Sequence, residues 1–146
     1  MNNIFNHILV PYNGTPGSQK AFKKAVALSE ALQTKVTILT CLEERPTFGF
    51  FKTKTTKQEF EKETNLVEKQ YLEMKNFANK YGVSINSKII KNGDVPEKIL
   101  NFAKQHDVDL IVMGRKKFTT PNERMNYYST VESVSRNADC SLLIVH

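Results

Sequence analysis

Short apolar runs that alternate with longer amphipathic stretches are the feature that most constrains how this chain of 146 residues can fold. Four runs have the length and the density of β-branched residues that are typical of buried strands. They are residues 7–12, 36–41, 110–113 and 142–145. A fifth segment, residues 83–90, alternates apolar with polar residues, which predicts a strand at a sheet edge with only one well-covered face.

Apolar residues recur at helical spacing between these strand candidates, which predicts four helices. Asp94 is a suitable cap for the third helix, with Pro96 in its first turn. The four predicted helices cover residues 16–32, 60–81, 95–106 and, as a short helix, 131–138. The resulting order βαβαβαβαβ requires right-handed crossovers, so we expect a doubly wound α/β fold: one parallel sheet with helices on both faces and any ligand at the carboxyl ends of its strands.

Composition places limits on the class of protein. The length fits a single domain over residues 1–146, and a formal net charge of +6 favours acidic partners, although a merely soluble basic surface is the simpler interpretation. Cys41 and Cys140 are too isolated to indicate a disulfide framework or a zinc site. The start of the chain does not resemble a signal peptide, and no apolar run is long enough for a membrane span, so we expect a cytoplasmic protein.

Two of the loops at the carboxyl edge of the predicted sheet have a composition that suits an anion. Residues 13–18 lead into a helix N-terminus and could hold a phosphate, or could form only a turn and a helix cap. Residues 114–128 contain the consecutive cations Arg115, Lys116 and Lys117 and a predicted helix cap at Ser129, which makes this loop either the best anion site of the chain or a solvated basic turn.

The long loop at residues 42–57 is the third candidate. It combines Phe48, Phe50 and Phe51 with several lysines, so it is a possible lid or contact surface, or its aromatic residues fold back onto the core. Its lysines Lys52, Lys54 and Lys57, with residues 115–117, also permit nucleic-acid binding, although the pattern is generic. The three histidines form no nucleophile-and-base arrangement, so the sequence offers little for hydrolytic catalysis and favours binding over turnover.

The chain resembles the universal stress protein family over essentially its whole length. The segments that carry this resemblance are residues 7–15, 93–100, 107–114 and 129–145. The resemblance implies an adenine nucleotide alpha hydrolase-like fold with strand order 3-2-1-4-5, and homodimers formed through the last strand, Leu142 to Val145. Pairing through that strand would also cover an apolar sheet edge.

The resemblance also implies a set of nucleotide-binding positions. Asn13 stands where the family typically has an aspartate, and its amide could still hydrogen-bond a base or a sugar. Cys41 matches a position beside the adenine and Gly93 one beside the ribose. The further positions implied at this pocket are Pro11, Gly14, Thr15, Met113, Arg115 and Thr130.

The family's phosphate loop has the pattern Gly-x2-Gly-x9-Gly-Ser/Thr, and only part of it matches. Gly114 fits the first glycine, Lys117 stands at the second, Tyr128 at the third, and Ser129 supplies the hydroxyl. Side chains at two glycine positions reduce the room for a triphosphate, while Lys117 adds charge. We therefore expect a degenerate nucleotide pocket.

Three functions remain open at this stage. The first is a dimeric stress-response regulatory protein that binds partners. The second is a sensor that binds an adenine nucleotide, ATP or AMP, with at most slow hydrolysis and with magnesium only where a nucleotide is bound. The third is a nucleic-acid-binding protein.

Overall fold

Strands and helices alternate along the entire chain. The structure, a computed structural model, describes residues 4–42, 54–91, 93–115 and 121–146. The elements, in chain order, are β1 (His7–Pro11), α1 (Pro16–Leu32), β2 (Lys35–Leu42), α2 (Lys54–Asn79), β3 (Ile85–Lys91), α3 (Val95–Gln105), β4 (Leu110–Gly114), α4 (Pro121–Asn137) and β5 (Ser141–Val145). Within the described ranges, no helix is both long enough and apolar enough to cross a membrane.

The five strands form one parallel sheet in the order β3-β2-β1-β4-β5. This confirms the predicted strand order and the predicted edge position of the third strand. The chain winds from β1 to β2 on one side, and the crossover after β3 then returns to β4 on the other side of β1. In sheets of this kind, ligands bind in the crevice outside the carboxyl ends of the strands at such a change of direction, which here falls between β1 and β4.

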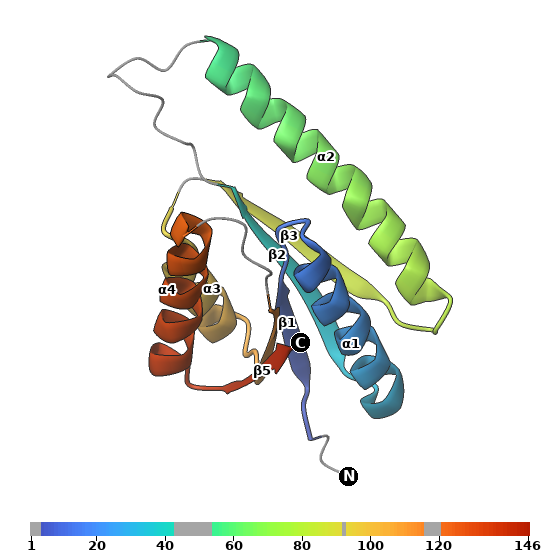
Figure 1. Cartoon of the computed structure of the whole chain (residues 1–146). Coiled ribbons are helices and arrows are strands. Elements are labelled where there is room, and N and C mark those ends of the chain that lie inside the picture. Colours follow the sequence, from blue (N-terminus) through green and yellow to red (C-terminus); the bar gives the residue numbers. More distant parts are fainter. Residues whose placement is uncertain (1–3, 43–53, 92, 116–120) are drawn as a thin grey trace.

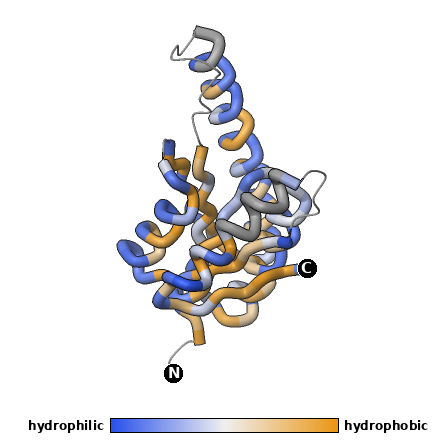
Figure 2. The backbone as a smooth tube through the Cα atoms, turned by 60° about the vertical axis from the view of Figure 1, so that its left-hand side comes forward, coloured by the Kyte–Doolittle hydropathy of each residue, from blue (hydrophilic) through white to orange (hydrophobic). Residues whose placement is uncertain are grey.

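The helices cover the two faces of the sheet in pairs (Figure 1). One core cluster packs side chains of α1 and α2 against one face, and a second packs side chains of α3 and α4 against the other. Successive residues of β1 alternate between the two clusters: Ile8 and Val10 belong to the first and Leu9 to the second. All three are fully buried, which explains why the strand is apolar throughout instead of alternating. Figure 2 shows the resulting pattern, with apolar strands inside and hydrophilic stretches along the helices.

Two helix starts follow the predicted capping chemistry. The Thr15 side chain caps α1 by accepting a hydrogen bond from the Ser18 N–H, and the Asp94 carboxylate accepts one from the Glu97 N–H at the start of α3. These side chains satisfy N–H groups that lack intrahelical partners, which fixes the residue at which each helix begins. Both starts follow a strand and so lie next to the carboxyl edge of the sheet.

The prediction for the fourth helix was wrong at its start. The helix α4 begins at Pro121, not near Ser129, so Ser129 is an interior residue of the helix and not its cap. Proline at a first helical position is favourable, since its missing N–H would have no intrahelical partner there. The first three residues after Pro121 are Asn122, Glu123 and Arg124, so no apolar residue marks the first turn of the helix. The helix α2 similarly begins at Lys54, before the predicted residue 60.

The amino edge of the sheet contains a buried histidine. The Nδ1 of His7 lies 2.8 Å from the carbonyl oxygen of His106 and its Nε2 lies 2.7 Å from the Thr37 hydroxyl. A carbonyl can only accept, so His7 carries its proton on Nδ1 and the Thr37 hydroxyl donates to Nε2. The backbone N–H of His7 donates to the Asp109 carboxylate. His106 itself caps the end of α3 and stacks on Phe102, so its role in the described structure is to end this helix.

Candidate functional site

The loop after β1 forms a closed polar turn at the carboxyl edge. The side-chain oxygen of Asn13 accepts hydrogen bonds from the backbone N–H of Thr15 at 3.2 Å and from its hydroxyl at 2.7 Å. Gly14 between them has φ of 81°, a left-handed conformation that glycine adopts without strain. The exposed amide nitrogen of Asn13 has no hydrogen-bond partner among the described residues. Asn13 therefore uses its acceptor to hold the turn and presents a donor to any ligand.

The end of β4 lies directly against the start of α1. A Cβ atom on Gly114 would be 1.9 Å from the carbonyl oxygen of Gly17 and 2.9 Å from the backbone nitrogen of Ser18. Only glycine permits this approach, because backbone atoms cannot move aside as a flexible side chain can. The first glycine of the predicted phosphate loop is thus also required for the packing that forms the crevice.

Apolar side chains form the part of this edge that faces α3 and α4. Met113 is buried, and half-buried Cys41 packs against the same core cluster, together with Val95 at the start of α3. Pro11 is the last residue of β1 and is also half-buried. A flat apolar group such as a nucleobase suits such a surface.

Gly93 immediately precedes the Asp94 cap of α3 and is exposed. The aliphatic part of the Lys98 side chain lies over it, so that a Cβ on Gly93 would come within 2.2 Å of the Lys98 Cε. Sequence reasoning did not identify Lys98 because a lysine in a helix is most often a solvated surface residue. Its position over Gly93 adds a cation close to the expected sugar position.

Arg115 continues the ladder between β4 and β5 beyond the last strand residue. Its backbone N–H donates to the carbonyl oxygen of Val145 at 2.8 Å, and its Nη1 lies 3.1 Å from the Nδ1 of His146. Both side chains are exposed. The proximity of His146 was not predicted, since residues 31 positions apart meet here only through the pairing of β4 with β5.

Two predicted positions lie away from the loops. Ser129 and Thr130 belong to α4, about two helical turns after Pro121. Lys117, Lys52 and the greater part of the loop at residues 42–57 lie outside the described residues. The remaining predicted positions lie at the carboxyl ends of the strands or directly after them: Pro11, Asn13, Gly14, Thr15, Cys41, Gly93, Met113, Gly114 and Arg115. Within the described part of the chain, no group of three or more His, Cys, Asp or Glu residues could hold a metal ion.

Comparisons with known proteins agree with this architecture. The model of the universal stress protein family matches residues 5–146. The universal stress protein YxiE of Bacillus subtilis is 32% identical, with 97% of this chain and 99% of that protein covered. Universal stress protein MJ0531 of Methanocaldococcus jannaschii is 27% identical, with 98% of this chain and 83% of that protein covered.

Solved structures show the same fold. Universal stress protein UspA from Lactobacillus plantarum aligns with a TM-score of 0.82 at 23% identity and covers 99% of this chain and 100% of its own. A universal stress protein in complex with cAMP aligns with a TM-score of 0.63 at 20% identity, covering 97% of each chain. A family protein from Arabidopsis thaliana with AMP bound aligns with a TM-score of 0.66 at 13% identity, covering 96% of this chain and 90% of its own.

These structures confirm the predicted adenine nucleotide alpha hydrolase-like fold. Because the family model matches nearly the entire chain, this protein belongs to the universal stress protein family.

Proposed function

We propose that this chain is a dimeric stress-response regulatory protein that binds an adenine nucleotide with a short phosphate group, such as AMP or cyclic AMP, at its carboxyl edge. The observation that carries this proposal is the early start of α4 at Pro121. Ser129 and Tyr128, which match the end of the family's phosphate loop, are then helical residues instead of loop residues. A helix at these positions leaves less loop to surround a triphosphate than the full pattern provides.

Two further observations support an adenine nucleotide as the ligand. Met113 and Cys41 lie near the carboxyl ends of β4 and β2, and the exposed amide of Asn13 follows β1, a combination that suits a base with a polar rim. Two structural neighbours were solved with cAMP and with AMP. Two departures from the family pattern, Lys117 and Tyr128, fall in the phosphate loop, and one, Asn13, falls at the base and sugar, so the phosphate end of the site is altered more than the base end.

A thermal-shift titration with AMP, cyclic AMP, ADP and ATP, each with and without magnesium, tests the selectivity. A ligand at ~100 times its dissociation constant adds roughly 2.7 kcal/mol to the free energy of unfolding. We expect AMP or cyclic AMP to raise the melting temperature more than ATP with magnesium does. Equal or stronger stabilisation by ATP with magnesium would contradict the short-phosphate proposal.

Backbone amide chemical shifts test the location of the site. We expect AMP to shift the amides of Asn13, Gly14, Cys41 and Gly114 at the carboxyl edge, and to leave that of Asp109 at the amino edge unchanged. Shifts confined to the amino edge, or spread evenly over the chain, would refute the proposed position.

The two edges of the sheet differ in a way that supports dimerisation through β5. The edge strand β3 carries Lys88 and Lys91, charges that discourage pairing with another strand. The strand β5 has no charged residue, and its Leu143 side chain is 38% exposed. Figure 2 shows β5 as a continuous apolar segment that leads to the C-terminal end. An uncharged apolar edge is a site for strand pairing, which a second copy of the chain would satisfy.

Sedimentation velocity tests the dimer. We expect Leu143→Lys to shift the protein towards the monomer, because it places a charge at the proposed interface. Leu72→Lys is the matched control: Leu72 is 64% exposed on α2, away from β5. A wild type that sediments as a monomer, or a Leu72→Lys variant that dissociates as readily, would contradict pairing through β5.

A further inference from the structure

The contact between Arg115 and His146 defines the protonation of the histidine. An arginine guanidinium has five N–H donors and no acceptor, and it stays protonated in proteins. The Nδ1 of His146, 3.1 Å from the Nη1 of Arg115, must therefore be the unprotonated acceptor, and the proton lies on Nε2. The contact uses one N–H of the guanidinium and leaves the others available.

We propose that His146 is a positioning residue that holds Arg115 as the phosphate-binding side chain of the site, so that the pair determines the preference for nucleotides over nucleosides. This inference rests on the proposed binding of an adenine nucleotide. It adds a residue from beyond the last strand to a site otherwise formed by the loops after β1, β3 and β4.

The position of Arg115 favours an anion. Arg115 directly follows Gly114, which packs against Gly17 in the first turn of α1. The N-terminus of a helix carries partial positive charge and favours anions, and the first turn of α1 contains no acidic residue that would offset it. An anion beside Gly114 would therefore lie near the start of α1, and Arg115 is the next residue along the chain.

The contact with His146 has a physical consequence for affinity. Arginine recognises phosphate best when its planar fork presents two parallel N–H groups, and a free arginine loses rotamer freedom when it does so. A guanidinium that His146 already holds at one nitrogen loses less rotamer freedom when it binds a phosphate. The backbone N–H of Arg115 donates to the carbonyl oxygen of Val145, the residue before His146, so the end of β5 restrains both the main chain and the side chain of Arg115.

Affinities for AMP and adenosine, measured by calorimetry, separate the phosphate contribution from that of the base. We expect Arg115→Ala to weaken AMP binding about tenfold, the size of a lost charge-assisted hydrogen bond, and to leave adenosine binding unchanged. His146→Ala should weaken AMP binding roughly threefold through loss of the anchor. His146→Asn should bind AMP within about twofold of wild type, since its side-chain oxygen can accept where Nδ1 does.

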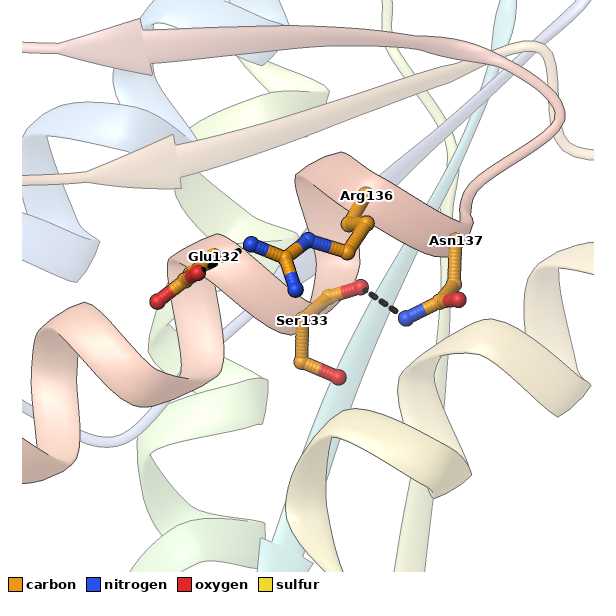
Figure 3. Close-up of polar contacts among 4 residues, drawn as sticks. All are labelled: Glu132, Ser133, Arg136 and Asn137. Atoms are coloured by element: carbon orange, nitrogen blue, oxygen red, sulfur yellow. Dashed lines mark hydrogen bonds and ion pairs between the residues drawn. The ribbon is translucent and has the colours of Figure 1, made fainter.

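Arg136→Ala is the matched control for charge. Arg136 lies near the end of α4, where it pairs with Glu132, and Figure 3 shows this pair beside the Asn137 to Ser133 hydrogen bond where the chain turns towards β5. It is 73% exposed. Arg136→Ala and Arg115→Ala each lower the formal net charge of +6 by one unit, so any difference between them comes from position. We expect less than a twofold change in AMP binding for Arg136→Ala.

The possible outcomes separate the two levels of the proposal. If neither AMP nor adenosine binds the wild type, the proposed function fails and this inference fails with it. If both bind but the ratio of their affinities is the same in wild type, Arg115→Ala and His146→Ala, the inference alone is overturned. The same holds if His146→Asn loses as much AMP affinity as His146→Ala, because the acceptor would then have no role.

Discussion

Replacing Gly114 by alanine tests whether the contact between β4 and α1 is as close as the structure indicates. The added Cβ would lie 1.9 Å from the carbonyl oxygen and 2.2 Å from the carbonyl carbon of Gly17, and 2.9 Å from the nitrogen of Ser18. All three are backbone atoms in the first turn of a 17-residue helix, so relief requires movement of the helix or of the strand. Overpacking at buried positions typically costs ~1–3 kcal/mol, and this contact lies at the upper end of that range.

Gly82→Ala is the appropriate control because it separates backbone conformation from packing. Gly82 has φ of 71°, and no heavy atom lies within 4 Å of a Cβ at that position. Alanine at position 82 should lower the free energy of unfolding only through the strain of the left-handed conformation, which is about 1–2 kcal/mol. Gly114 has no such positive φ, so its cost comes from the clash with Gly17 alone.

Urea denaturation followed by circular dichroism gives the free energy of unfolding for both variants. We expect Gly114→Ala to lose roughly 3 kcal/mol and Gly82→Ala roughly half of that, at unchanged m-values. For a chain of this size, 3 kcal/mol corresponds to a decrease in melting temperature of about 6–12 °C. A Gly114→Ala variant that is as stable as Gly82→Ala, or more stable, would refute the close approach of β4 to α1.

The remaining predictions concern three single side chains. Burial lowers the pKa of His7 in the folded chain from 6.5. Between 6.5 and this lower folded pKa the unfolded chain binds more protons than the folded chain, so the free energy of unfolding should fall as the pH falls. Urea titrations at several pH values should therefore show a flatter pH profile for His7→Asn than for the wild type. Burial also raises the pKa of Tyr71 to about 12, so ultraviolet titration should show tyrosine ionisation that extends to about pH 12, and Tyr71→Phe should reduce this late signal. Tyr71→Phe should also cost about 1 kcal/mol in urea, since its hydroxyl donates to Thr40 in the core. Thr15→Ala should lower the free energy of unfolding by about 1 kcal/mol in the same assay, because it removes the side-chain cap of α1.

The sheet could be predicted from the sequence because both of its faces are covered. Burial on two sides makes strands such as β1 and β4 apolar throughout, which distinguishes them from the helices between them. The edge strand β3 has the weaker cover that its alternating pattern indicates. The order of the strands came from the family resemblance, since apolar patterns alone do not show which strand lies beside which.

The start of α4 and the neighbours of the site could not be predicted, for two physical reasons. The first turn after Pro121 consists of the polar residues 122–124, so no apolar residue marks the start of the helix, although proline is suited to a first turn. The contact of Arg115 with His146 and that of Lys98 with Gly93 depend on strand register and on side-chain conformation. The spacing of residues in a single sequence predicts neither the strand register nor the side-chain conformation.

The described polar groups at the carboxyl edge are mostly donors, and this property narrows the ligand class further. The side-chain oxygen of Asn13 is occupied by Thr15, and the oxygen of Thr15 by the Ser18 N–H. Among the described groups, the donors that remain for a ligand include the amide nitrogen of Asn13, N–H groups of Arg115 and the ammonium of Lys98, while the Asp94 carboxylate is an acceptor that also caps α3. Such an edge suits a ligand rich in acceptors and negative charge. A phosphate-bearing nucleotide fits that requirement better than a nucleoside, whose hydroxyl and amine donors would have to find backbone carbonyls instead.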